Sequence, residues 1–141
     1  MTDEELRKLL LDTRVIAVVG LSANPDRPSN QVAWYLHHQG YRLFGINPRS
    51  PEQEVFGIPM LPSLDQVPEP IDIVDVFRRP EYTPPVARDA VAVGAGVLWL
   101  QLGIASAESK AIAEDAGLAY VEDHCLKVEH ARLLGGSAHR L

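Results

Sequence analysis

Three arginines stand where a phosphate-bearing ligand would need them, each shortly after an apolar run of the sequence. They are Arg49, which follows Asn47-Pro48, and the pair Arg78-Arg79, which precedes Pro80. A guanidinium group binds two phosphate oxygens at once and also stacks on an aromatic base. We therefore expect the pair to neutralise a pyrophosphate or stack on an adenine, and Arg49 to bind a phosphate on a ribose. The alternative is that all three are surface arginines, with the pair bonded to Asp75 or Glu81.

The loop after the first apolar run offers a second kind of anion site. Gly20-Leu21-Ser22 follows this run, and a helix is predicted to begin at Asn30, directly after Ser29. Gly20 permits a tight turn, and the free N–H groups at a helix N-terminus attract anions. The pattern is not G-x-G-x-x-G, because Ser22 occupies the second glycine position. The competing interpretation is a glycine that ends a buried strand, with Ser29 or Asn30 capping the helix.

A fourth polar turn, Gln101-Leu102-Gly103, ends another apolar run. Gln101 is expected to hydrogen-bond an amide or a base of the ligand. Gly103 is expected to allow close approach of the backbone. A glycine that only ends a strand is the alternative.

The segment 123–130 concentrates titratable side chains around the single cysteine, Cys125. A metal site needs three or four converging ligands, and one cysteine with two histidines is not a recognisable set, so we predict no metal site. Cys125 beside a histidine would also suit a nucleophile, or a mixed disulfide with a thiol ligand. The preferred interpretation is a small buried cysteine at the start of a helix capped by Asp123. No catalytic residue is predicted.

Strand-like and helix-like segments alternate along the chain and place these turns. The expected strands are 14–20, 41–47, 56–60, 71–77, 97–102 and 118–121, and the expected helices are a short one opened by the capping box Thr2-x-x-Glu5, then 30–39, 83–93, 106–117 and 126–134. The alternation indicates an α/β protein with a Rossmann-like, doubly wound, mainly parallel sheet of about five or six strands and helices on both faces. Ligands of such sheets bind at the carboxyl ends of the strands. The four polar turns, 20–22, 47–49, 78–80 and 101–103, all lie at the ends of predicted strands.

Composition narrows the function classes. The 141 residues, 46% of them apolar, fit a single domain spanning 1–141, and the net charge of −6 excludes broad nucleic-acid binding. No apolar run approaches the ~20 residues that cross a bilayer, so no membrane is expected. The acidic N-terminus lacks a signal-peptide pattern and one cysteine cannot form an internal disulfide, so we expect a cytoplasmic protein. The glycines at the start of 135–141 predict a disordered tail.

Together the motifs resemble those of the small stand-alone CoA-binding-domain proteins, relatives of the N-terminal CoA-binding domain of the succinyl-CoA synthetase alpha subunit. The resemblance covers about residues 3–134. Its motifs are Val18-Val19-Gly20-Leu21-Ser22, Arg27-Pro28-Ser29, Ile46-Asn47-Pro48-Arg49, Asp72-Ile73-Val74-Asp75-Val76-Phe77-Arg78-Arg79, Trp99-Leu100-Gln101-Leu102-Gly103 and Cys125-Leu126-Lys127-Val128-Glu129-His130. The resemblance implies a Rossmann-like fold that binds coenzyme A or an acyl-CoA. It places the ligand contacts at Gly20 to Ser22, Pro48-Arg49, Arg78 to Pro80 and Gln101 to Gly103.

The resemblance also limits the activity it implies. The synthetase forms its thioester through a phosphohistidine on a second domain, for which 141 residues leave no room. Neither His124 nor His130 matches the position of that histidine. The resemblance therefore implies a binding module that is not a CoA ligase by itself.

Two other functions stay open. An NADP-binding oxidoreductase or sensor would use Arg49 on the 2′-phosphate, since no acidic residue ends the second strand, although no Tyr-x-x-x-Lys pair is present. A CoA-binding subunit of a separately encoded ligase or transferase would need an interface, for which Trp34-Tyr35 offers apolar surface. A homodimer is expected on base rates alone.

Overall fold

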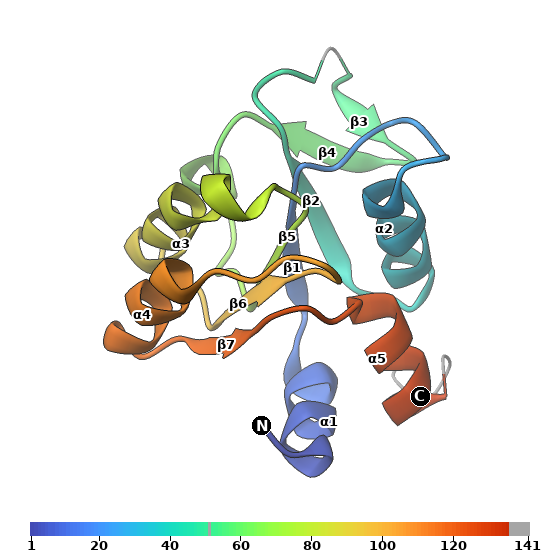
Figure 1. The fold of residues 1–141 in the computed structure, drawn as a ribbon. Coiled ribbons are helices and arrows are strands. Elements are labelled where there is room, and N and C mark those ends of the chain that lie inside the picture. The colour runs from blue at the N-terminus through green and yellow to red at the C-terminus, as the bar shows by residue number, and fades with distance from the viewer. Residues whose placement is uncertain (51, 136–141) are drawn as a thin grey trace.

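The central sheet determines where the four polar turns lie. The computed structural model describes residues 1–50 and 52–135, and in them seven strands form one sheet in the order β3-β4-β2-β1-β5-β6-β7 (Figure 1). The strands are β1 (Val15–Val19), β2 (Arg42–Ile46), β3 (Glu54–Val55), β4 (Ile58–Leu61), β5 (Ile73–Val76), β6 (Val97–Leu100) and β7 (Ala119–Val121). Every neighbouring pair is parallel except β3 and β4. The strand order reverses at β1, which pairs with both β2 and β5, and ligands of such sheets bind at this switch point.

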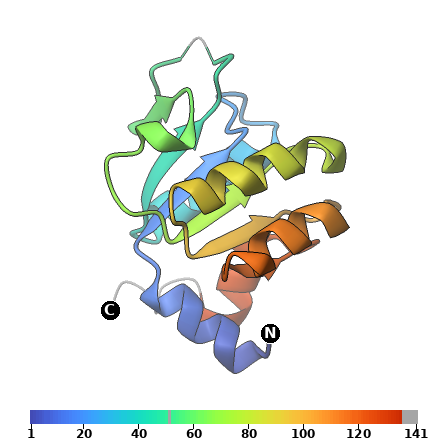
Figure 2. The same cartoon turned by 90° about the vertical axis from the view of Figure 1, so that its left-hand side faces the viewer.

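Within the described residues five α-helices cover the two faces of the sheet (Figures 1 and 2). They are α1 (Asp3–Asp12), α2 (Pro28–His38), α3 (Thr83–Ala92), α4 (Ala107–Asp115) and α5 (Leu126–Leu134). Helices α1, α2 and α5 share one core with Val18 and Trp99 of the sheet. Helices α3 and α4 share the other core with Val19 and Val74. The predicted α/β, doubly wound and mainly parallel fold is confirmed.

The strand count differs from the prediction at one place. The sequence predicts a single strand over 56–60, whereas the structure has a hairpin in which β3 and β4 are joined by Phe56-Gly57. Both turn residues have positive φ, 40° for Phe56 and 82° for Gly57. A bulky aromatic residue rarely adopts this conformation, so Phe56 carries no turn signal in the sequence.

Helix boundaries follow the expected chemistry with one shift. The capping box of Thr2 and Glu5 is present, and Ser106 caps α4. Helix α2 begins at Pro28, two residues before the predicted Asn30, because proline at the first helical position already has a helical φ. The predicted disorder of the tail 135–141 falls, apart from Gly135, outside the described residues.

Gly20 draws the ends of β1 and β5 together. Its φ is +89°, and a Cβ built on it would lie 2.5 Å from the carbonyl oxygen of Phe77. At the other edge of the sheet, Asp72 Oδ2 accepts hydrogen bonds of 2.9 Å from the backbone N–H groups of Arg14 and Val15. The two strands of the switch point are therefore fixed at both ends.

Candidate ligand-binding site

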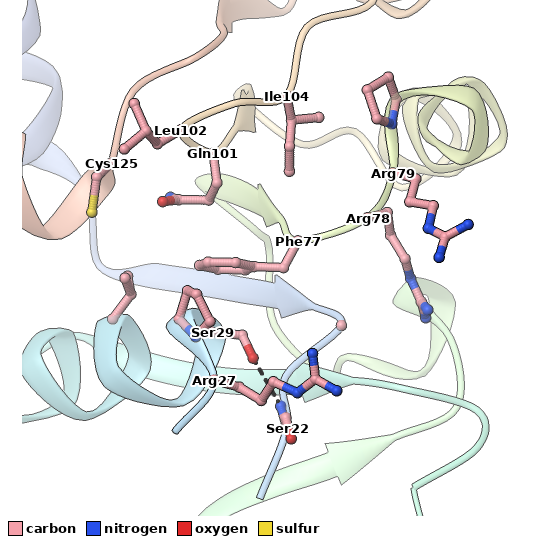
Figure 3. Close-up of a pocket in the computed structure, with 14 residues that line it drawn as sticks. Ser22, Arg27, Ser29, Phe77, Arg78, Arg79, Gln101, Leu102, Ile104 and Cys125 are labelled. Carbon is pink, nitrogen blue, oxygen red and sulfur yellow. Dashed lines mark hydrogen bonds between the residues drawn. The ribbon is translucent and has the colours of Figure 1, made fainter. Parts of the chain in front are cut away.

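A pocket of about 710 Å³ opens at the carboxyl ends of β1, β5 and β6, between the first residues of α2 and α5 (Figure 3). Its lining residues are Gly20, Ser22, Arg27, Pro28, Ser29, Val32, Phe77, Arg78, Arg79, Pro80, Gln101, Leu102, Ile104 and Cys125. Three of the four polar turns expected from the sequence contribute to it, and the turn Asn47-Pro48-Arg49 does not. The pocket is of the size typical of small-molecule sites.

The N-terminus of α2 faces this pocket and carries no competing group. Its N-cap residue, Arg27, makes no side-chain cap, and no acidic residue lies in the first turn. Ser29 Oγ accepts a hydrogen bond of 3.1 Å from the Ser22 N–H, and Asn30 Nδ2 donates to the Ser22 carbonyl oxygen at 2.9 Å. Ser29 and Asn30 are therefore not caps: they are buried side chains that fix the loop after β1 against the helix.

Three arginines line one side of the pocket, and no acidic residue lines it. They are Arg27, Arg78 and Arg79, of which the last two precede the 3₁₀ turn Pro80–Tyr82. Among the described residues no ion pair or side-chain hydrogen bond reaches any of the three guanidinium groups. The expected alternative, a pair of arginines bonded to Asp75 or Glu81, is not what the structure contains. The local charge favours an anionic ligand.

The opposite side of the pocket is mainly apolar. Phe77, Leu102 and Cys125 lie there with Gln101 between them (Figure 3). Cys125 lies at the start of α5, as predicted, but it is itself the N-cap in place of Asp123 and is only partly buried. Leu102 is 69% exposed, so an apolar side chain at the pocket is open to solvent.

Gln101 is connected to a buried acid beneath the pocket. Its Nε2 donates to Asp75 Oδ1, and both side chains are almost inaccessible to solvent. Burial raises the pKa of Asp75 to about 7, and the hydrogen bond from Gln101 opposes only part of that shift. Sequence reasoning did not assign Asp75 to the site, although an aspartate inside an apolar strand marks it.

Six predicted residues lie outside the pocket lining: Leu21, Asn30, Asn47, Pro48, Arg49 and Gly103. Leu21 is fully buried. Asn47 connects two turns, since Nδ2 donates to the Leu21 carbonyl oxygen at 3.3 Å and Oδ1 accepts from the Arg49 N–H at 3.1 Å. Arg49 itself is exposed beyond β2.

Gly103 is required by the geometry of its turn. A Cβ built on it would meet nothing within 4 Å, and its N–H donates to Asp123 Oδ1 at 2.7 Å. Its φ of +84° shows that the turn requires the left-handed conformation. Glycine is needed there for the turn, and the approach of a ligand to this backbone stays a prediction.

Six lining residues were not predicted as ligand-binding residues and add to the site: Arg27, Pro28, Val32, Phe77, Ile104 and Cys125. The motif Arg27-Pro28-Ser29 was the available signal for the first two. Among the described residues no cluster of three or more histidine, cysteine, aspartate or glutamate side chains is placed to hold a metal ion. None of the described helices has the length and apolar character needed to cross a membrane.

Comparisons with known proteins agree with this geometry. The chain is 38% identical to the Bacillus subtilis protein YneT over 127 residues, which cover 90% of this chain and 93% of that protein. A solved structure from Thermus thermophilus, cell-free ID.343, superposes with a TM-score of 0.90 at 42% identity and covers 94% of this chain and 99% of its own. Both relatives are therefore of nearly the same extent as this chain.

A more distant relative is a ligase. The chain is 26% identical over 125 residues to the ADP-forming acetate–CoA ligase I of Archaeoglobus fulgidus, and the match covers 80% of this chain but only 18% of that enzyme. A family model described as a CoA binding domain matches residues 14–131, which include every strand and all the pocket-lining residues. The chain belongs to this CoA-binding-domain family.

Proposed function

We propose that the chain binds coenzyme A or an acyl-CoA in the pocket at the carboxyl ends of β1, β5 and β6. The observation that carries this proposal is the division of the pocket. One side has arginines without acidic partners, and the other has Phe77, Leu102 and Cys125 (Figure 3). Coenzyme A is divided in the same way, with phosphates toward one end and a less polar pantetheine arm that ends in a thiol at the other.

The pyrophosphate belongs at the cationic side. The uncapped N-terminus of α2 supplies backbone N–H groups and the positive end of the helix dipole. Arg78 and Arg79 come from the end of β5, and Arg27 comes from the start of α2, so the charges converge from two elements. Hydrogen bonds between a guanidinium group and a phosphate are charge-assisted and are stronger than hydrogen bonds between neutral groups.

The 3′-phosphate of the ribose is assigned to Arg49. This residue lies in the turn after β2, the strand next to β1, and outside the pocket. The assignment requires the ligand to extend from the pocket across the end of β1. Asn47 supports this geometry because it holds the Arg49 turn against the loop after β1.

The proposed role is that of a binding module without ligase activity of its own. The related acetate–CoA ligase aligns with this chain over only 18% of its length, so the larger part of that enzyme lies outside the match. A CoA-binding subunit of a separately encoded ligase or transferase is the second candidate, favoured by the same match. We place the protein in the cytoplasm as a prediction from its single cysteine.

Calorimetric titration of the protein with CoA, dephospho-CoA and NADP tests the proposal. We expect saturable binding of CoA that is tighter than binding of dephospho-CoA, with no heat from NADP. Heat from NADP alone would overturn the proposal in favour of a nicotinamide nucleotide. Heat from none of the three would mean that this chain does not bind CoA by itself, and the ligase-subunit candidate would then be tested by co-purification.

A further inference from the structure

Asp75 lies on β5 two residues before Phe77, just beneath the residues that line the pocket. In the parallel register of β5 and β6, Asp75 pairs with Trp99, and Phe77 and Gln101 follow two residues later on the same face of the sheet. On its other side Asp75 pairs with Val18. The carboxyl group is therefore enclosed by apolar neighbours, with no exposure to solvent.

Among the described residues, Gln101 is the hydrogen-bond partner of this carboxyl group. Gln101 Nε2 donates to Asp75 Oδ1, and Asp75 Oδ2 has no partner. Asp75 Oδ1 accepts this bond in the ionised carboxylate and equally in an acid that holds its proton on Oδ2, so in both states the NH2 group of the glutamine amide points toward Asp75. The Oε1 atom of Gln101 is then the amide atom that remains for another partner.

That oxygen is available to a ligand. The Gln101 side chain is 97% buried and lines the pocket, and no donor from the described residues reaches its Oε1. Oε1 is not one of the fully buried side-chain atoms that lack a partner, so it is accessible from the pocket and a ligand N–H can hydrogen-bond to it. In Figure 3, Gln101 extends between Phe77 and Cys125, away from the arginines.

We propose that Asp75 is a positioning residue that fixes the Gln101 amide with Oε1 toward the ligand, so that the pocket selects an N–H donor at this point. This inference rests on the proposed CoA binding, in which the donor is a secondary amide of the pantetheine arm. The phosphates occupy the arginine side, and the arm is the part of CoA that reaches Phe77, Gln101 and Cys125. A ligand that presents a carbonyl or carboxylate oxygen to Oε1 is disfavoured, because two acceptors then face each other.

The test compares CoA with adenosine 3′,5′-bisphosphate, a nucleotide probe that lacks the arm and its amides. Gln101→Met keeps the length of the side chain and removes the acceptor. We expect it to weaken CoA binding about tenfold, the loss typical of one buried hydrogen bond, and to leave binding of the bisphosphate unchanged. Asp75→Asn can donate or accept, so it no longer dictates the amide orientation, and we expect a smaller loss that is again confined to CoA.

A spectroscopic readout examines Asp75 without any substitution. In the wild-type protein the Gln101 side-chain NH2 should exchange slowly with solvent, and CoA should shift the Gln101 side-chain carbonyl ¹³C resonance. This readout stands even where Asp75→Asn fails to fold. An NH2 group that exchanges freely would contradict the role assigned to Asp75.

The outcomes separate this inference from the function it rests on. Unchanged CoA affinity in Gln101→Met, or an equal loss for CoA and the bisphosphate, would overturn the inference while CoA binding stands. Wild-type protein that binds neither probe would overturn the proposed function and the inference with it. A loss for CoA alone supports both.

Discussion

The amino and carboxyl ends of the strands carry hollows of nearly equal size but of different charge, balanced at the amino ends and positive at the carboxyl ends. The hollow at the amino ends of the strands has a volume of about 690 Å³, and the pocket at the carboxyl ends has about 710 Å³. Arg14 and Arg42 line the first together with two acidic residues, Glu69 and Asp72. Three arginines and no acidic residue line the second.

Three of the four charged side chains at the amino edge, those of Arg42, Glu69 and Asp72, are bonded within the protein. Arg42 Nε donates to Glu69, and Asp72 accepts hydrogen bonds from two backbone N–H groups at the start of β1. At the carboxyl edge the guanidinium groups have no acidic partner among the described residues. Cavity volume therefore does not identify the site. Charges that the fold leaves unpaired do, and the following substitutions compare the two edges directly.

Gly20→Ala should have the largest effect, by destabilising the carboxyl edge. Its Cβ would lie 2.5 Å from the Phe77 carbonyl oxygen at a φ of +89°. The left-handed conformation and the overlap together should cost about 3–4 kcal/mol of unfolding free energy. Urea denaturation measures it, with Gly96→Ala at the amino edge as control, where the Cβ would lie 3.0 Å from the Asp72 carbonyl oxygen. A larger loss for Gly96→Ala would contradict the packing described for Gly20.

Arg78→Ala combined with Arg79→Ala should weaken CoA binding by at least about 100-fold. Each guanidinium that bonds a phosphate contributes about 1.5–3 kcal/mol, and neither has a partner to release in the free protein. The matched control removes two positive charges from the amino edge, by Arg14→Ala combined with Arg42→Ala. Calorimetry should find CoA affinity unchanged in that control. Equal losses in the two double variants would mean that net charge, rather than the pocket, determines binding.

Asp75 should make the free energy of unfolding depend on pH. Its pKa is raised by burial to about 7, so the folded protein holds a proton that the unfolded chain releases near pH 4. The stabilisation is complete below about pH 4 and is lost as pH rises from 4 to 7, by about 3 kcal/mol between pH 5 and pH 8. Urea midpoints measured across this range should fall for the wild type and much less for Asp75→Asn. Parallel profiles for the two proteins would argue against a buried proton at Asp75.

Arg49→Ala should have the smallest of these effects and the most specific one. Loss of one exposed phosphate contact should weaken CoA about tenfold and leave dephospho-CoA unchanged, because only CoA has the 3′-phosphate. Calorimetry with both ligands measures the difference. If both affinities fall equally, Arg49 does not bind the 3′-phosphate, and Arg27 in the pocket becomes the residue to test.

The sequence predicts the carboxyl edge well because strand ends and turn residues carry local signals. Apolar runs that end in Gly20 and Gln101, and the pair Arg78-Arg79, are all visible without a structure. Arg27 and Phe77 are harder to assign, since their place in the pocket depends on packing between α2 and β5. Periodicity also misses the Phe56-Gly57 turn, because an aromatic residue with positive φ has no sequence signature.

Side-chain partners are the part that sequence cannot supply. Ser29 and Asn30 look like ligand donors or helix caps, yet both hydrogen-bond Ser22 and hold the loop after β1. From the sequence, Asp75 looks like a partner for the arginines that follow it. In the structure its carboxyl group accepts a hydrogen bond from Gln101 instead. These choices are made by contacts between distant segments.

The most direct test of the central claim is an ¹⁵N-resolved NMR titration of the protein with CoA, because it reports both whether the ligand binds and at which edge. We predict that the backbone amide signals of Ser22, Ser29 and Arg78 at the carboxyl edge shift saturably. The signals of Arg14 and Arg42 at the amino edge should stay in place. Shifts confined to the amino edge, or no shifts at saturating CoA, would contradict the account.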